Sequence, residues 1–395
     1  MSYRLPEGPE YIIERLRSRG KQAYAVGGCV RDMLLGCEPK DYDITTSALP
    51  EQILEIFSDH RTVETGIKHG TVTVMRGGEP YEVTTFRIDG DYRDSRHPES
   101  VSFTESVTLD LSRRDFTMNA IAYNSIEGLI DPFDGKADIK RGVIRAVGDP
   151  VQRFCEDALR IMRAVRFAST LGFSVDEKCA EAVRELYPLL SRVSGERIRV
   201  EWEKLLAGRN AYGVISEFSE PLKFILGLDR LRLPSEEKFN TVSPEIRGLA
   251  IFELSAADPT ESFTAFTERQ KYDNRTKDRG RLLLSLLRIS VRNKEEAVDV
   301  LLSAGRENIR DLISLRALCD RCDGGEAEII ESVLSSGAPL TLHELDLCGK
   351  DITALGISGR EVGELLHLLL RKAALGEVEN RRDALTALAV ELTKG

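Results

Sequence analysis

The sequence predicts an α+β protein in which a mixed or antiparallel sheet comes first and an all-helical region follows. Segments with the two-residue period of strands are concentrated before residue 148. The stretch GTVTVMRGGEPYEVTTFR, residues 70–87, holds two such segments around a Gly-Gly-Glu-Pro turn, and a hairpin of this kind favours antiparallel neighbours. From Val151 onward almost every apolar pattern has the helical period of about 3.6 residues.

The elements expected before residue 148 are closely spaced. They are, in order, a strand at 23–28 that runs into a glycine turn, a short helix at 29–36, a strand with alternating faces at 41–48, a helix at 50–58 and the hairpin at 70–87. Gly36 ends the first of these helices, and Pro50 opens the second. Together they form a mixed α/β region.

The helical region begins with a long expected helix at 151–173, in which Asp157 and Arg160 project as near neighbours. Its packed face would consist of Val151, Phe154, Ala158, Met162 and Val165. Turn residues suggest further divisions inside the helical region. The predicted domains are therefore 1–148, 149–205, 206–295 and 296–395.

Bulk composition excludes several classes of protein. The chain has 395 residues, enough for two to four domains, and its N-terminus lacks the pattern of an export signal. Its strongest apolar run, LLLSLL at 282–287, is far shorter than the roughly 18 residues that cross a bilayer. Seven scattered cysteines fit reduced thiols, so we expect a cytoplasmic protein without a membrane partner.

The charge pattern leaves room for local contact with nucleic acid. A net charge of −10 argues against coating nucleic acid through a bulk positive potential. One stretch is nevertheless basic: Lys271, Arg275, Lys277, Arg279, Arg281, Arg288, Arg292 and Lys294 are answered only by Asp273 and Asp278. It is either a solvated helix face or a set of phosphate contacts.

Two aspartates in the expected strand at 41–48 suggest a metal site. Residues two apart in a strand point the same way, so Asp41 and Asp43 converge on one face while Tyr42 and Ile44 pack on the other. A pair of carboxylates suits a hard cation that also meets substrate phosphates, and Mg²⁺ is the natural candidate. An acidic strand start that faces solvent would have the same pattern.

The glycines upstream favour the metal site over that alternative. Gly27 and Gly28 let the backbone approach a phosphate closely, and the helix after them would point its N-terminus at the same anion. A phosphate-binding turn beside a carboxylate pair is typical of a nucleoside triphosphate site. Glu82, on a nearby strand, is either a third carboxylate of this site or an outward-facing strand residue.

Five motifs together resemble one family. They are GGCVRD at 27–32, DYDI at 41–44, RRDFTMNA at 113–120, EDALR at 156–160 and GERI at 195–198. In this order they are similar to the motifs of class II tRNA nucleotidyltransferases, the CCA-adding enzymes and bacterial poly(A) polymerases of the polymerase-β nucleotidyltransferase superfamily. Weaker similarity extends to the C-terminus.

The resemblance implies a domain plan and an activity. Residues 1–148 would be the catalytic nucleotidyltransferase head, 149–205 a neck that selects the base, 206–295 a body, and 296–395 a tail that binds tRNA. The implied activity is template-independent addition and repair of the 3′-terminal CCA of tRNA from CTP and ATP with Mg²⁺, releasing pyrophosphate. An enzyme that adds only the terminal A, a poly(A) polymerase and a catalytically silent RNA-binding protein remain alternatives, and DNA is not an expected partner.

The resemblance also assigns the head residues. Asp41 and Asp43 would be catalytic and bind metal, with Glu82 as a possible third ligand. The phosphates and ribose of the nucleotide would be held by Gly27, Gly28, Arg31, Arg113, Arg114, Asp115 and Asn119. Guanidinium forks suit triphosphate oxygens, and Asp115 or Asn119 can hydrogen-bond a ribose hydroxyl. Without the resemblance, this arginine and aspartate cluster reads as an ordinary surface cluster.

In the resembled family, the residues at Asp157 and Arg160 act as a protein template for the incoming base. Cytosine and adenine each present an amino donor beside an unprotonated ring nitrogen, which a carboxylate and a guanidinium satisfy together. Uracil and guanine reverse this polarity, and each buried group left unpaired costs about 1 to 3 kcal/mol. Arg153, Glu156 and Arg163 would position the pair or contact the primer.

The last expectations concern a loop and the tRNA surface. Residues 87–103 read as a mobile loop, and in the family a loop with residues such as Asp89, Asp94 and Arg96 is linked to the switch from CTP to ATP. Alone, the segment reads as an ordinary surface loop. The 3′ end and acceptor arm of tRNA would meet the basic stretch at 271–294 and Arg371, Lys372, Arg381 and Arg382.

Overall fold

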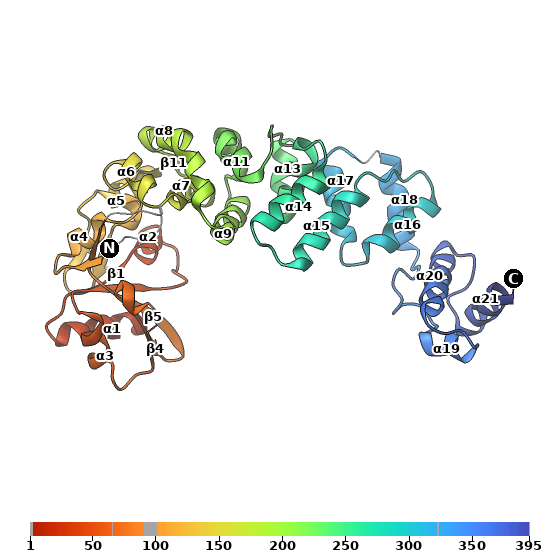
Figure 1. The fold of residues 1–395 in the computed structure, drawn as a ribbon, viewed down its shortest axis with the longest axis horizontal. Coiled ribbons are helices and arrows are strands. Elements are labelled where there is room, and N and C mark those ends of the chain that lie inside the picture. The colour runs from red at the N-terminus through yellow and green to blue at the C-terminus, as the bar shows by residue number, and fades with distance from the viewer. Residues whose placement is uncertain (1–2, 65, 91–100, 322–323, 395) are drawn as a thin grey trace. The chain divides into compact units, whose positions relative to one another are not determined.

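The computed structural model describes residues 3–64, 66–90, 101–321 and 324–394. It divides into two compact units, residues 1–226 and 227–395 (Figure 1). The first unit contains the sheet and the helices that follow it, and among the described residues of the second the regular elements are all helices. This confirms the predicted α+β class. The division into head, neck, body and tail stays a prediction.

A seven-stranded mixed sheet forms the centre of the first unit, in the order β3-β4-β5-β2-β1-β8-β9. Its strands are β1 Ala23–Val26, β2 Asp43–Thr46, β3 Thr62–Val63, β4 Thr71–Arg76, β5 Glu79–Thr85, β8 Ala122–Asn124 and β9 Gly128–Ile130. Only β2 and β5 run parallel within this sheet. The predicted hairpin is present, with a turn at Gly77 and Gly78 alone, because Glu79 already pairs with Arg76.

Strand β2 departs from the expected alternation. Ile44, Thr45 and Thr46 are all fully buried, because β2 lies between β1 and β5 and helices cover both faces of the sheet. Helices α1 Glu7–Ser18 and α3 Pro50–Ile56 lie on one face. On the other face, Val107 and Leu111 of α4 Val107–Ser112 join the core of β1.

The other elements of the head are short. They are α2 Gly28–Leu34, the 3₁₀ turns η1 Ile67–His69 and η2 Thr117–Asn119, and α5 Gly135–Arg141. Strands β6 Arg87–Asp89 and β7 Val101–Phe103 pair antiparallel, so both ends of the segment predicted as a loop are strands. Residues 91–100, with Asp94 and Arg96, lie outside the described residues. The helical prediction from residue 151 onward also misses β11 Ser174–Val175, which pairs with β10 Val143–Ile144.

The helix predicted at 151–173 is two helices. Helix α6 Pro150–Glu156 ends at Asp157, whose φ of −136° and ψ of 103° are extended, and α7 Leu159–Leu171 begins two residues later. Phe154, Ala158, Met162 and Val165 are buried as predicted, but Val151 is 43% exposed. The apolar pattern continues across the break, so periodicity could not reveal it. The remaining helical elements of this unit are α8 Glu177–Leu186, η3 Tyr187–Arg192, α9 Gly195–Leu206, α10 Ala211–Glu217 and α11 Ser219–Leu226.

The second unit is a succession of helices. They are α12 Glu236–Thr241, α13 Pro244–Ser255, α14 Pro259–Arg269, α15 Asn274–Leu286, α16 Lys294–Ala304, α17 Ile309–Leu318, α18 Gly324–Ser335, α19 Gly349–Ala354, α20 Arg360–Leu375 and α21 Arg382–Lys394. Helices α19, α20 and α21 share a leucine-rich core. In the described part of the chain, no helix combines the length and apolar character needed to cross a bilayer.

Candidate active site

The site begins at the turn between β1 and α2. Gly27 has φ 82° and ψ −128°, a conformation that favours glycine. A Cβ atom at Gly27 would also lie 3.0 Å from Nη1 of Arg114, so a side chain there would have to displace this guanidinium group slightly. The turn therefore brings the backbone at Gly27 and a guanidinium group, both predicted to bind phosphate, close to each other.

The predicted carboxylates lie beside this turn. Asp43 is the first residue of β2 and is paired with Val26, the residue before Gly27. Ile44 pairs with Val83 in the neighbouring parallel strand, so Asp43 and Glu82 come next to each other on the opposite face. Asp41 precedes the strand and is exposed, as is Glu82.

The electrostatics of Asp43 reflect this crowding. The residue is exposed overall, yet local burial and then the charge of Glu82 raise the pKa of its carboxyl to about 6. Asp41 adds to the rise in pKa, and Arg114 opposes it. Like charges held together in this way are relieved by a cation, and their oxygen atoms suit a hard one. Among the described residues, however, no three acidic, histidine or cysteine side chains are close enough together to enclose a metal ion.

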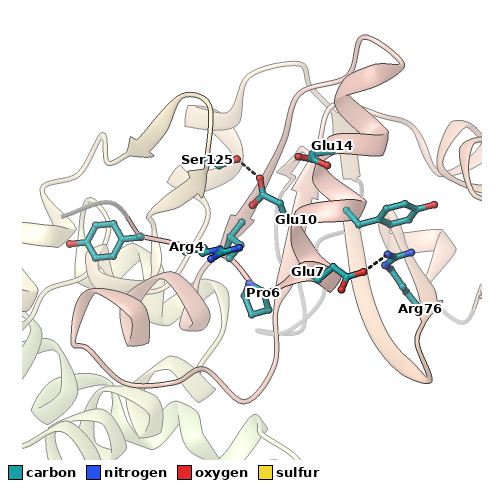
Figure 2. A pocket seen from close by; sticks show the side chains of 10 residues that line it. Arg4, Pro6, Glu7, Glu10, Glu14, Arg76 and Ser125 are labelled. Atoms are coloured by element: carbon teal, nitrogen blue, oxygen red, sulfur yellow. Dashed lines mark hydrogen bonds and ion pairs between the residues drawn. The ribbon is translucent and has the colours of Figure 1, made fainter.

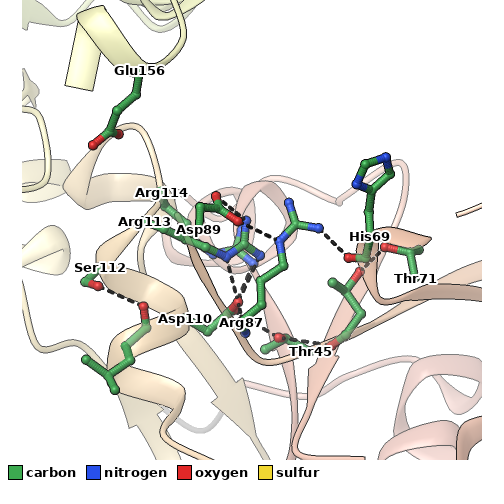
Figure 3. A network of polar contacts seen from close by, with 12 residues as sticks. Thr45, His69, Thr71, Arg87, Asp89, Asp110, Ser112, Arg113, Arg114 and Glu156 are labelled. Carbon is green, nitrogen blue, oxygen red and sulfur yellow. Dashed lines mark hydrogen bonds and ion pairs between the residues drawn. The ribbon is translucent and has the colours of Figure 1, made fainter. Parts of the chain in front are cut away.

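Arg113 and Arg114 directly follow α4, on the face of the sheet that α4 covers. Both face Asp110, and Arg113 also lies 3.7 Å from Asp89 of β6 (Figure 3). Asp89, predicted as part of a loop, thus belongs to an ion-paired strand, where its carboxylate is 3.1 Å from Nε of Arg87. The cluster is a partly buried charge network.

Asp115 and Asn119 are joined in a chain of hydrogen bonds. Arg31 donates to Oδ1 of Asn119 at 2.8 Å, and the amide of Asn119 donates to Oδ1 of Asp115 at 3.0 Å. Oδ2 of Asp115 accepts from Nε of Arg163 at 2.8 Å. Burial opposes the charge of Asp115, but Arg163, Asn119 and Arg160 outweigh it and lower its pKa to about 2. The head residues predicted to meet the ribose are therefore fixed by an arginine of α7.

Asp157 and Arg160 lie near each other, but their side chains are held by different partners. Oδ1 of Asp157 accepts from the backbone N–H of Leu159 at 3.1 Å, and Oδ2 accepts from Arg197 at 2.9 Å. Arg160 donates to Glu156 at 2.8 Å and to the backbone carbonyl of Arg113 at 2.8 Å. The orientation of each side chain is thus held by its own partners. Arg160 also links α7 to the RRDFTMNA segment.

The supporting residues Glu156 and Arg153 are ion-paired at 2.6 Å. Sequence reasoning did not assign four charged residues that hold the site: Asp110, Arg166, Arg197 and Glu201. Arg197 belongs to the GERI motif, and its partner is Asp157. Asp110 precedes Arg113 by three residues, a spacing that could have indicated the pair. Arg166 and Glu201 come from different helices, so only the fold joins them.

A separate hollow lies at the start of α1. Its volume is about 820 Å³, and it is lined by Tyr3, Arg4, Leu5, Pro6, Glu7, Glu10, Tyr11, Glu14, Arg76 and Ser125 (Figure 2). Glu7 and Arg76 are ion-paired at 3.0 Å across it. None of its lining residues was predicted for the site, and the glycine turn and the carboxylates lie elsewhere.

The region that contains the sheet matches a family of polymerase head domains. The Poly A polymerase head domain family matches residues 23–145, and the family described as the probable RNA and SrmB-binding site of polymerase A matches residues 172–219. The CCA-adding enzyme of Geobacillus stearothermophilus is 39% identical over 389 residues, covering 96% of this chain and 95% of that protein. The chain belongs to the family of CCA-adding enzymes.

Solved structures agree with this assignment. A crystal structure of the Bacillus stearothermophilus CCA-adding enzyme in complex with CTP superposes with a TM-score of 0.75 at 35% identity, covering 98% of each chain. The Thermotoga maritima CCA-adding enzyme complexed with tRNA shares the fold, with a TM-score of 0.68 at 23% identity and coverage of 97% and 94%.

Proposed function

We propose that this chain builds and repairs the 3′-terminal CCA of tRNA from CTP and ATP, without a nucleic-acid template, and releases pyrophosphate. The observation that carries the proposal is the meeting of Gly27, Asp43 and Arg114 at one end of the sheet. A triphosphate placed there would be surrounded by the backbone turn at Gly27, the guanidinium group of Arg114 and the carboxylate of Asp43. Membership of the CCA-adding family supports the choice of reaction.

The carboxylates of Asp41, Asp43 and Glu82 fit a divalent metal, for which we propose Mg²⁺. Asp41 and Asp43 would hold it, and the register of β2 and β5 makes Glu82 the neighbouring carboxylate. The ion would supply charge neutralisation and activation of the tRNA 3′-hydroxyl. The chain itself contributes Arg113 and Arg114 as cations for the triphosphate, and Asn119 beside Asp115 for the ribose.

We propose that Asp157 and Arg160 select the base. Both side chains have fixed partners, so neither has to be ordered when a nucleotide binds. Cytosine and adenine can each donate from the amino group to Asp157 and accept from Arg160 at the adjacent ring nitrogen, whereas uracil and guanine present a carbonyl and a ring N–H in the reverse order. Two side chains therefore give the preference that a template strand provides in other polymerases.

For the partner we propose the 3′ end and acceptor arm of tRNA, bound through phosphate contacts along the helical unit. Several of the predicted basic residues also have protein partners: Arg371 is paired with Asp299 at 2.6 Å, and Arg281 with Asp278 at 3.2 Å. These arginines are at least partly exposed, so phosphates can compete for them. We further propose that the enzyme works in the cytoplasm, in line with free thiols at Cys29, Cys37, Cys155, Cys179, Cys319 and Cys348.

The test uses four tRNA transcripts that end before CCA, after C, after CC and after CCA. Each is incubated with the full chain, Mg²⁺ and CTP, ATP or both. We expect completion of the first three and no extension of the fourth. Extension of the CC-ended transcript alone would identify an A-adding enzyme, and long A tracts would identify a poly(A) polymerase. Absence of any extension with intact tRNA binding would indicate a silent RNA-binding protein.

A further inference from the structure

One buried carboxylate beside the site has been described only as an ion-pair partner of Arg113 and Arg114. Asp110, in the short helix α4, is 0% exposed and lies among the charged residues next to the candidate triphosphate site (Figure 3). A fully buried charge is costly unless other groups compensate for it. Its partners therefore indicate what the fold gains by keeping it.

The two carboxylate oxygens of Asp110 have different partners. Oδ1 accepts from Nε of Arg113 at 2.9 Å and from the backbone N–H of Arg87 at 3.3 Å, and it lies 2.8 Å from Nη2 of Arg113 in an ion pair. Oδ2 accepts from the hydroxyl of Thr45 at 3.0 Å and faces Nη2 of Arg114 at 3.7 Å. One side chain thus contacts both arginines and two strands.

The contact with Thr45 connects Asp110 to the strand that carries Asp43. Thr45 follows Asp43 by two residues in β2, so both side chains lie on the same face of the sheet. The carboxylate of Asp110 therefore links the guanidinium groups to the strand that carries Asp43. Arg114 in turn lies against Gly27, whose Cβ position would be 3.0 Å from its Nη1.

The charges agree with the geometry. Burial disfavours the ionised form of Asp110, but the charges of Arg113 and Arg114 hold its pKa below the usual range. The two arginines are consecutive in the chain and repel each other. Burial lowers the pKa of Arg114, and Asp110 offsets part of that effect. An ionised carboxylate between them reduces the repulsion, holds the guanidinium group of Arg113 by a hydrogen bond and attracts that of Arg114 at 3.7 Å.

We propose that Asp110 is a positioning residue that sets Arg113 and Arg114 against β2, so that their guanidinium groups meet the triphosphate of either nucleotide. The proposal rests on the function proposed above, in which these arginines bind the triphosphate. Asp110 itself is too deeply buried to touch the substrate. Loss of Asp110 should weaken the binding of CTP and ATP equally, because the triphosphate is the part that the two nucleotides share.

The test compares Asp110→Asn with a matched variant, Asp138→Asn. Asp138 is also 0% exposed, accepts from a threonine hydroxyl at 2.6 Å and pairs with Arg141 and Arg145, but none of these arginines was assigned to the site. We expect Asp110→Asn to raise KM for both CTP and ATP by about tenfold, equivalent to about 1.4 kcal/mol, with tRNA affinity unchanged. Asp138→Asn should lower thermal stability and leave both KM values unchanged.

A double-mutant cycle separates positioning from a general structural role. If Asp110 acts through Arg114, adding Asp110→Asn to Arg114→Ala should change KM further by less than about twofold. Full additivity, or a KM shift in Asp110→Asn no larger than in Asp138→Asn, would overturn the proposal. If Asp110→Asn does not fold, Thr45→Val replaces it in the test. We expect a smaller rise in both KM values, and unchanged KM values would overturn the proposal. An unchanged KM in Arg114→Ala would instead refute the triphosphate site itself.

Discussion

The start of the central strand β2, called the acidic edge below, and the helices that follow the sheet both concentrate charged side chains, but the charges are balanced in opposite ways. At the edge, Asp43 shares its surroundings with Glu82 and Asp41, and its pKa rises to about 6. Where α7 and α9 meet the sheet region, carboxylates are matched by guanidinium groups, and Arg163 of α7 helps to lower the pKa of Asp115 to about 2 against the effect of burial. The acidic edge therefore carries excess negative charge that favours a cationic ligand. The paired charges of α7 and α9, called the helical frame below, instead hold the proposed base-selecting side chains in place.

The largest effect should come from removing charge at the edge. We expect Asp43→Asn to lower nucleotide incorporation by about a thousandfold or more, because a lost metal ligand costs several kcal/mol in the transition state. The same change relieves repulsion with Glu82, so the free energy of unfolding should stay equal or rise. Single-turnover incorporation and urea unfolding measure the two quantities. A variant that is both active and less stable would contradict the assignment of this edge.

The opposite pattern is expected for a charge inside the helical frame. Glu201 of α9 is 4% exposed and accepts from Nε of Arg166 at 2.7 Å. Breaking a buried pair leaves a charge without its partner, so Glu201→Gln should lower the free energy of unfolding by about 3 kcal/mol. Glu203→Gln, at an exposed position of the same helix, is the control and should cost less than about 0.5 kcal/mol. Equal losses in the two variants would refute the contrast.

Much of the edge could be predicted from the sequence because its parts are local. Gly27, Gly28 and Asp43 lie within one strand-turn-helix-strand segment, whose turn and strand could be read locally. The predicted strand began too early, however: β2 starts at Asp43, so Asp41 lies before it and the strand period does not fix its direction. The full burial of Thr45 could not be foreseen in the same way, since it depends on the neighbours of β2.

The frame was less predictable, for a physical reason. The apolar pattern at 151–173 continues across the break at Asp157, because Phe154 and Ala158 are buried on both sides of it. The partners of Asp157 and Glu201 come from other helices, and only tertiary packing selects them. The matched motifs showed that GERI matters, but not that its Arg197 holds the predicted base-selecting carboxylate.

The pH dependence of stability offers a finer test of the frame. The pKa of Asp115 is about 2 in the folded protein, below the value of about 3.9 for an unfolded chain. Its ionised form therefore stabilises the fold above about pH 4, and this contribution is lost as the pH falls toward 2. Relative to Asp115→Asn, the wild-type chain should lose about 2 kcal/mol over this range. Urea unfolding from pH 7 downward measures the difference, and a constant gap would contradict the prediction.

The smallest effect concerns base choice, and it tests whether the frame is needed for more than stability. Arg197 fixes Oδ2 of Asp157 at 2.9 Å without being assigned to contact the nucleotide. In Arg197→Gln the carboxylate can rotate, so discrimination of CTP over UTP should fall by about tenfold, within the cost of about 1 to 3 kcal/mol for an unpaired group. Arg199→Gln in the same helix is the control and should leave discrimination unchanged. If Arg197→Gln keeps full selectivity but unfolds more easily, its ion pair only stabilises the neck, and base selection depends on Asp157 and Arg160 alone.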